Sequence, residues 1–287
     1  MSPPDVTVVR ACLRDGAGGS PTAVVLENDG HSPPPDDDER RRIPVARGTS
    51  HAVYIRHVGD TTELRFFTAE GELPACGHGT VAALALLAAR HTGAGPYRAT
   101  LRAGGRVFAG RAERDGDLIT AAFDPGPVDL REPTAQERTL VPAALGLTPQ
   151  QAPRGIRIAG VGRERMLVPL PTRAAVAALR PDPDRLRAAC DRFGLLGAYV
   201  HSQPTPHGAL AARMFAPSAG VDEDIANANG TACLAAHLAG RGIRRITVDM
   251  GDALASPATV TATADTDLRV ELGGTARVPT KQNQQTS

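Results

Sequence analysis

Two short segments of this chain carry side chains suited to acid–base and anion-binding chemistry. The first reads ELPACGHGT over residues 72–80, and the second reads DEDIANANGT over residues 222–231. In both, a turn of small and polar residues directly precedes an apolar run rich in Ala and Leu. Such runs form buried helices, and helix N-termini present N–H groups and partial positive charge that bind carboxylates. The pair predicts a small carboxylate held from both sides.

The first segment offers a thiol and an imidazole at the expected start of a helix. Cys76 directly precedes Gly77, where the helix dipole favours the thiolate form. His78 is a candidate for moving a proton, and its structural alternative is capping the helix. We expect Gly77 and Gly79 to bind a carboxylate through backbone N–H groups.

The second segment offers amide and hydroxyl groups at an equivalent helix start. Asn229, Gly230 and Thr231 are the candidate carboxylate-binding residues there. Cys233 lies three residues further along and is expected in the core of the protein rather than in a site.

Composition excludes several classes of function. The 287 residues carry 32 Lys and Arg against 31 Asp and Glu, with no Trp and 3% aromatic residues, so nothing indicates nucleic-acid or membrane binding. No apolar run is long enough to span a membrane and no signal peptide is evident, which predicts a cytoplasmic protein. The four cysteines are scattered, and no phosphate-binding, zinc-protease or dinucleotide motif occurs. We therefore expect no metal and no organic cofactor.

The remaining elements predict an α+β protein with many strands around each apolar helix. Residues 28–42 read as a loop, and their charged run DDDERRR over residues 36–42 is interpreted as solvated surface. His201 and His207, which flank a Pro-rich turn, are also expected at the surface. Expected strands cover residues 6–12, 22–26, 52–57, 63–67, 99–101, 106–109, 118–123, 155–159, 166–169, 198–202, 210–215, 245–249, 258–264 and 268–272, and further helices cover 173–179 and 183–193.

The motifs resemble those of the PhzF-like isomerases of the phenazine-biosynthesis type. Residues 64–68 (LRFFT) followed by residues 72–80 are similar to the first signature, and residues 213–217 (RMFAP) followed by 220–232 are similar to the second. The similarity covers about residues 5–280. It implies the diaminopimelate epimerase-like fold, in which two pseudo-symmetric lobes each wrap a barrel-like sheet around a central helix, with the active site between them.

The lobes implied by this resemblance are residues 1–124 and residues 128–267. A strand near residues 268–280 would complete the first lobe, and the Pro–Gly-rich residues 124–127 form the linker. Residues 281–287 read as a disordered tail. Relatives with this fold often dimerise, so a homodimer is expected.

Departures from the family pattern decide the expected chemistry. Racemases of this fold use one thiol from each lobe, but the position that would match the second thiol is Asn229, so a two-thiol racemase is not expected. PhzF-like isomerases carry a Glu in a Ser-Glu-Thr context, and the matching stretch here places His51 after Ser50, which is itself a candidate substrate-binding residue. Imidazole titrates near neutrality, so His51 is the expected acid/base and His78 its assistant.

A second departure concerns the carboxylate of the second lobe. Asp224 resembles the Asp of the family's Asp-Pro-Ala-Thr-Gly-Ser signature, but two extra residues separate it from Gly230. Counted strictly, the Asp position is Ala226. Either the loop bulges and Asp224 still reaches the site, or an amide of Asn227 or Asn229 replaces the carboxylate.

These residues predict a cofactor-independent isomerase that moves a double bond in a small unsaturated carboxylic acid, in secondary metabolism such as antibiotic biosynthesis. An alkyl-dihydropyrrole carboxylate is the substrate expected. One alternative is a racemase or epimerase with unlike bases, such as Cys76 opposite His51. Others are a non-catalytic protein that binds small acids and a purely structural dimer.

Overall fold

A computed structural model describes residues 5–27, 34–151, 153–267 and 269–279. The chain divides into two compact units, each of which makes most of its contacts within itself. Unit 1 comprises Met1–Asp124 and Gly273–Ser287, and unit 2 comprises Pro125–Leu272. The boundary after Asp124 falls within the Pro–Gly segment, whereas the expected tail at residues 281–287 lies outside the described residues.

The strands of unit 1 form a closed sheet, in which the last strand pairs with the first. The hydrogen-bonded order is β1–β2–β3–β4–β6–β7–β8–β17 and back to β1, which is a closed ring of eight strands. The elements are β1 (Val6–Ala11), β2 (Ser20–Leu26), α1 (Asp37–Ala46), β3 (His51–Val58), β4 (Thr61–Phe67), β5 (Glu72–Leu73), α2 (Gly77–Arg90), β6 (Tyr97–Ala103), β7 (Arg106–Asp115), β8 (Leu118–Phe123) and β17 (Val270–Arg277).

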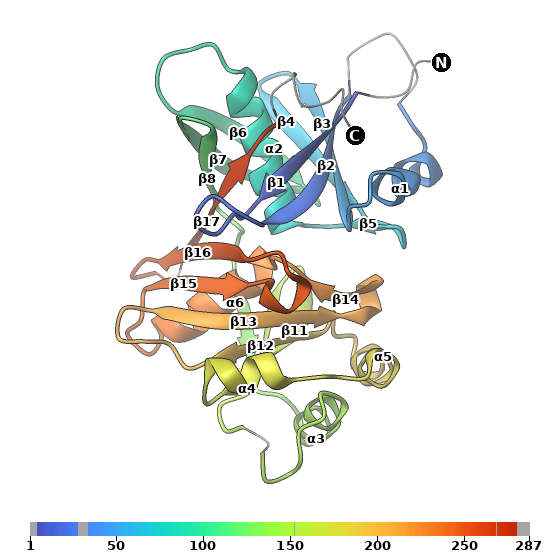
Figure 1. Ribbon diagram of the computed structural model, residues 1–287, viewed down its shortest axis with the longest axis vertical. Helices are drawn as coiled ribbons and strands as arrows, with labels where there is room; N and C mark the ends of the chain where they lie inside the picture. The colour runs from blue at the N-terminus through green and yellow to red at the C-terminus, as the bar shows by residue number, and fades with distance from the viewer. Residues whose placement is uncertain (1–4, 28–33, 152, 268, 280–287) are drawn as a thin grey trace. The chain divides into compact units, whose positions relative to one another are not determined.

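Helix α2 lies against the inner side of this ring (Figure 1) and contacts β1, β2, β3, β7 and β8. All of its residues from Gly77 to Ala88 are buried, as its apolar composition predicts. Sheet and helix approach each other closely at Gly110, because a Cβ there would lie 2.8 Å from the side chain of Leu101 and 3.0 Å from that of Leu84. The helix is therefore held in the core of unit 1.

Unit 2 repeats the pairing pattern of unit 1. In unit 1, β2 runs parallel to β3, β3 antiparallel to β4, and β6 returns parallel to β4 after α2. In unit 2, β11 runs parallel to β12, β12 antiparallel to β13, and β15 returns parallel to β13 after α6. This shared order confirms the predicted α+β class with two pseudo-symmetric parts.

The elements of unit 2 cover both faces of its sheet. Helix α6 contacts β9, β10, β11, β15 and β16, while Met166 and Val168 of β11 join a separate apolar cluster with residues of α3, α4 and α5. The elements are β9 (Asp129–Arg131), α3 (Ala135–Ala144), β10 (Arg157–Val161), β11 (Arg163–Leu170), α4 (Arg173–Ala178), α5 (Pro183–Arg192), β12 (Ala198–Ser202), β13 (Ala209–Ala216), β14 (Val221–Asp224), α6 (Ala228–Ala239), β15 (Arg245–Met250) and β16 (Ala258–Ala264), with 3₁₀ turns at Pro217–Ala219 and Asp252–Leu254.

The expected loop at residues 28–42 is wrong over its described part. Helix α1 starts within it, and Asp36 and Glu39 form a capping box at its N-terminus. The charged run is not simply solvated either, because Arg40 is buried. Helix α3, which was not predicted either, begins with the same device formed by Thr134 and Glu137. In both segments the capping box indicates a helix more strongly than the polar composition indicates a loop.

Two further observations concern exposure. His201 lies buried in β12, contrary to the surface position expected for it, whereas His207 is exposed as expected. Among the residues that the structure describes, no helix is long and apolar enough to cross a bilayer.

Candidate active site

Three of the predicted site residues lie together in unit 1, and we call them the His–Cys–His cluster. They are His51, Cys76 and His78, and the donor atoms of their side chains lie within 4.8 Å of one another. The two imidazole rings meet edge to face, with centroids 4.4 Å apart and planes at 82°. The Sγ of Cys76 is 3.5 Å from Nε2 of His78. Their relative exposures are 6%, 6% and 2%, so the cluster is largely shielded from bulk water.

The backbone of β3 and the preceding turn position His51. It is the first residue of β3 and pairs in parallel register with Thr22 of β2. Its Nδ1 lies 2.8 Å from the hydroxyl of Ser50, which orients the ring. Thr49 links this point to α1, because its N–H donates to the carbonyl of Pro44 and its hydroxyl donates to the carbonyl of His51.

The start of α2 positions the other two members. Cys76 is the N-cap residue, and its carbonyl accepts bonds from both the N–H and the hydroxyl of Thr80 at 2.9 Å. His78 follows in the first helical turn. Gly79 provides room for the thiol, because a Cβ there would lie 3.1 Å from Sγ and 3.0 Å from the ring of Phe66. Gly77 and Gly79 are both buried, and their carboxylate-binding role stays a prediction.

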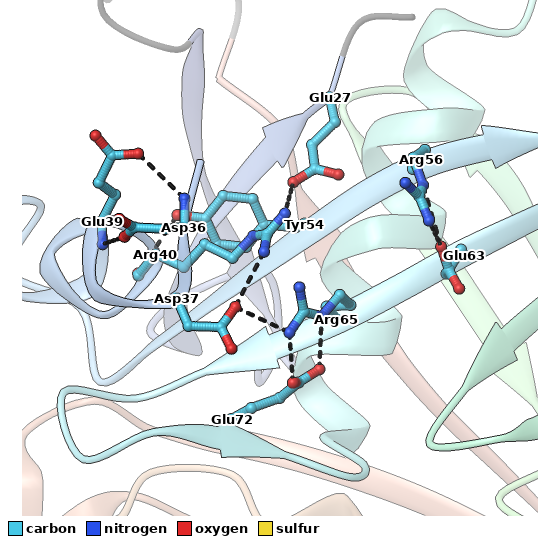
Figure 2. A network of polar contacts seen from close by, with 10 residues as sticks. All are labelled: Glu27, Asp36, Asp37, Glu39, Arg40, Tyr54, Arg56, Glu63, Arg65 and Glu72. Carbon is cyan, nitrogen blue, oxygen red and sulfur yellow. Dashed lines mark hydrogen bonds and ion pairs between the residues drawn. The ribbon is translucent and has the colours of Figure 1, made fainter. Parts of the chain in front are cut away.

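Ion pairs hold the segment that leads into Cys76, and Figure 2 shows them. Arg65 of β4 donates to both carboxylate oxygens of Glu72 in β5, at 2.8 and 2.6 Å, and also to Asp37 at 3.0 Å. Arg40 donates to the same Asp37 oxygen at 3.1 Å and to Glu27 at 2.7 Å. The first turn of α1 is therefore tied to the strand that precedes the cluster.

The second group of predicted residues lies at the start of α6 in unit 2. Asp224 ends β14 and is buried, and its carboxylate accepts bonds from the N–H of Ala226 at 3.3 Å and the side-chain amide of Asn227 at 2.9 Å. Asn227 is the N-cap residue, and its Oδ1 accepts from the N–H of Gly230 at 2.7 Å. Asp224 therefore lies beside the helix start, and the choice between the two loop alternatives stays a prediction. Contact of Asp224 with a substrate stays a prediction.

The remaining residues of this group are buried in the first turn of α6. Asn229 is buried in the first turn of α6. The hydroxyl of Thr231 is 2.8 Å from that of Tyr199 and donates to the carbonyl of Asn227. Gly230 faces the ring of Tyr199, where a Cβ would lie only 2.3 Å away. Substrate binding by these three residues stays a prediction.

Arg165 of β11 belongs to this group although no sequence pattern selected it. It is 1% exposed, and its Nη1 donates to Oδ1 of Asn227 at 2.9 Å. Arg165 follows Arg163 and Glu164 at the charged start of β11, and this short charged run carries no spacing signal, so only the fold reveals the contact. Burial raises the pKa of the nearby Cys233 thiol, and the residue is fully buried, which confirms its core position.

The structure thus gathers Ser50, His51, Cys76 and His78 with Gly77 and Gly79 in unit 1. It gathers Asp224, Asn229, Gly230 and Thr231 in unit 2. Imidazole, thiol and a helix N-terminus in the first group suit proton transfer on an acid. Carboxylate and amides at a helix start in the second group suit binding of a polar ligand.

The chain is similar to several known proteins. A family model described as phenazine biosynthesis-like protein matches residues 10–281. The uncharacterized isomerase YddE of Escherichia coli K12 is 30% identical over 192 residues, which are 64% of this chain. The match spans 63% of the length of that relative. Trans-2,3-dihydro-3-hydroxyanthranilate isomerase of Pseudomonas aeruginosa is 30% identical over 232 residues, covering 81% of this chain and 78% of the relative.

Solved structures show the same fold. A predicted epimerase from Pseudomonas aeruginosa superposes with a TM-score of 0.82 at 22% identity, covering 97% of this chain and 98% of that one. A hydroxyproline epimerase from Agrobacterium vitis gives a TM-score of 0.62 at 13% identity, covering 96% and 90%. The fold is therefore diaminopimelate epimerase-like, as predicted. With a family model matched from residue 10 to residue 281, this chain belongs to the phenazine biosynthesis-like protein family.

Proposed function

We propose that this protein is an isomerase that removes a proton from a small unsaturated carboxylic acid and returns it at another carbon, moving a double bond without a cofactor. The observation that carries this proposal is the edge-to-face pair of His51 and His78, with ring centroids 4.4 Å apart in a buried setting. Two imidazoles in contact can accept and deliver a proton near neutral pH.

In this mechanism His51 takes the proton, and Ser50 holds its ring by the contact at Nδ1. His78 relays or returns the proton. The N-terminus of α2 stabilises the negative charge that develops on the deprotonated acid, because its N–H groups point out of the helix end. The start of α6, with Asn229 and Gly230, is proposed as a second carboxylate-binding helix end.

The names of the relatives support an isomerase, since both the Escherichia coli and the Pseudomonas proteins are called isomerases. Trans-2,3-dihydro-3-hydroxyanthranilate is therefore the first acid to test. Alkyl-dihydropyrrole carboxylates, which would place the enzyme in the biosynthesis of an antibiotic or another secondary metabolite, form the second set.

The test is proton exchange with solvent, followed by NMR in D₂O and by ultraviolet absorption. We expect the wild type to incorporate deuterium and to shift the absorption of a conjugated acid. His51→Ala should slow exchange by about 100-fold or more, because a general base contributes that much. His51→Glu, which supplies another proton acceptor at this position, should recover part of the rate. The exposed His207→Ala is the matched control and should exchange at the wild-type rate.

Exchange that is undiminished in His51→Ala would refute the assignment of the base. Retained ligand binding in that variant, with no exchange of any candidate acid by the wild type, would instead favour a non-catalytic acid-binding protein.

A racemase or epimerase is the second candidate, because the Cys76 thiol lies in the same cluster at 3.5 Å from His78. It predicts deuterium at a retained stereocentre with no change in ultraviolet absorption. Cys76→Ala would then abolish exchange, whereas the double-bond migration proposed above should tolerate that substitution.

A further inference from the structure

The His–Cys–His cluster combines three side chains that bind transition metals, and its spacing is close to that of a metal site. We propose that His51, Cys76 and His78 bind one zinc ion, and that zinc and the transferred proton compete for the two imidazoles. The binding part of this proposal stands on the cluster alone, and the competition rests on the proposed function. The proposed zinc site differs from the expectation of no metal, because its three ligands form no metal-binding motif along the sequence.

The distances suit a tetrahedral ion. Zn–S of about 2.3 Å and Zn–N of about 2.0–2.1 Å separate tetrahedral donors by about 3.4–3.6 Å. Sγ of Cys76 already lies 3.5 Å from Nε2 of His78, and all three donors are within 4.8 Å of one another. Zinc binding would require side-chain rotation to bring any wider donor pair, up to 4.8 Å apart, to this spacing.

The contacts around the cluster select the ligating atoms. Ser50 contacts Nδ1 of His51 at 2.8 Å, so we assign Nε2 of that ring as the ligating atom. A hydrogen bond to the second ring nitrogen is the usual support of a metal-bound imidazole. For His78, Nε2 is the atom that faces the thiol. Zinc binds a cysteine as the thiolate, so metal binding at Cys76 would release the thiol proton.

The chemistry of the donors decides the metal. Two imidazoles and one thiolate suit zinc, whereas magnesium and calcium require oxygen ligands. Three protein ligands leave the fourth tetrahedral position for water or for a carboxylate oxygen of the bound acid. A zinc ion held in this way occupies the nitrogens that proton transfer needs, so metal binding should silence the exchange reaction.

Cobalt reports thiolate ligation directly and is the probe for the test. The full chain is treated with a chelator, titrated with Co²⁺, and followed by absorption, then challenged with Zn²⁺. We expect one equivalent of Co²⁺ to give a thiolate charge-transfer band with tetrahedral visible bands, and one equivalent of Zn²⁺ to remove them. A chromophoric chelator in competition measures the zinc affinity.

Variants identify the ligands. Cys76→Ala and Cys76→Ser should lose the charge-transfer band, and His51→Ala or His78→Gln should weaken zinc binding by at least about 100-fold. Ser50→Ala, which removes only the support of His51, should weaken it by about 10–100-fold. The matched controls are Cys233→Ala in the core and His207→Ala at the surface, both of which should bind like the wild type. Circular dichroism and thermal unfolding check that each variant is folded.

The outcomes separate the two proposals. Absence of the band in the wild type, or its persistence in folded Cys76→Ala, overturns the metal site. If the metal-free protein exchanges protons but never binds Co²⁺ or Zn²⁺, only the metal site fails. If it binds metal but exchanges no candidate acid, only the isomerase proposal fails. Zinc that binds at the cluster without slowing exchange overturns the competition.

Discussion

At the scale of single residues, packing constraints surround both predicted groups. Gly79 leaves room for the Cys76 thiol, and Gly230 lets α6 lie against Tyr199. The buried His201, outside both groups, forms a hydrogen bond between its Nδ1 and the carbonyl of Ser202 at 2.9 Å. The Pro-rich turn beside this histidine predicted a surface position, and that prediction was wrong. Its strand, β12, lies between β11 and β13 in the sheet of unit 2, and all five residues of β12 are buried.

Substitution of Gly230 tests how tightly α6 packs. Gly230→Ala should lower the free energy of unfolding by about 1–3 kcal/mol, because its Cβ would meet the ring of Tyr199 at 2.3 Å. Gly240→Ala is the control, since the backbone there is right-handed helical and its Cβ has no neighbour closer than 3.6 Å among the described residues. Urea unfolding measures both. Equal stabilities of the two variants would contradict this account.

Burial lowers the pKa of His201 to about 4, with smaller effects from His237 and Arg241. His201 therefore takes up a proton near pH 6.5 in the unfolded chain but only near pH 4 in the folded protein. The free energy of unfolding therefore falls as the pH falls from about 6.5 to about 4. Between pH 7.5 and 5 this group should cost about 2 kcal/mol of unfolding free energy.

His201→Asn keeps a hydrogen-bonding group near Nδ1 but does not titrate. Urea unfolding at pH 7.5 and at pH 5 should show a loss about 2 kcal/mol smaller in this variant than in the wild type. His207→Asn is the exposed control and should lose as much stability as the wild type. The same loss in all three proteins would count against the buried neutral imidazole.

At the scale of elements, α1 has a larger role than a surface helix. Its first turn is tied through Asp37 and Arg65 to Glu72, four residues before Cys76. Its end is tied through Thr49 to the start of β3 at His51. The guanidinium of Arg40 lies 5.3 Å from the ring centroid of Tyr54 and pairs with Glu27. One helix therefore supports both elements that supply the His–Cys–His cluster.

Adjacent arginines in α1 test this role. The side chain of Arg40 is 7% exposed and that of its partner Glu27 is 11% exposed, whereas Arg41 is 42% exposed. Arg40→Met should cost about 3 kcal/mol of unfolding free energy, because it leaves a buried carboxylate without its partner. Arg41→Met removes an exposed ion pair and should change stability by less than about 0.5 kcal/mol.

Guanidinium chloride would screen these ion pairs, so urea is the denaturant for this comparison. The double variant Arg40→Met/Glu27→Gln should recover part of the loss, because it removes the orphaned charge. If Arg40→Met is no more damaging than Arg41→Met, the pair does not hold α1 in place.

At the scale of the whole molecule, each unit wraps strands around one apolar helix by the same order of pairings. The ring of unit 1 is closed by β17, whose Arg277 pairs with Arg10 of β1 near the opposite end of the chain. Arg277 also binds Asp117 and the carbonyl of Gly16. Closing contacts so distant in sequence costs conformational entropy, but they remove the sheet edges that β1 and β8 would otherwise expose.

Truncation after Leu272 tests the closing strand. Without residues 273–287, β1 and β8 lose a hydrogen-bonded neighbour, so amides of β1, β8 and α2 should exchange with solvent much faster in hydrogen-exchange mass spectrometry. Amides of α6 in unit 2 serve as the internal control and should keep most of their protection. Unchanged exchange of β1 and β8 would show that the ring does not depend on β17.

The fold class, the two apolar helices and the turns that begin them can be predicted from the sequence. These features depend on local patterns, since Ala–Leu runs after Gly-rich turns favour buried helices whatever surrounds them. The family motifs are also local strings, and they led to the same class that the strand pairings and the comparisons establish. The sequence therefore identifies His51, Cys76 and His78 as candidate site residues.

Which of these groups contact one another depends on how the elements pack. The contact of His51 with His78 depends on β3 lying beside α2, and the bond of Arg165 to Asn227 depends on β11 lying beside α6. The burial of Arg40 and His201 was likewise decided by packing, against the local composition. Distance and burial arise from contacts between residues far apart in the chain, and no local pattern in the sequence records them.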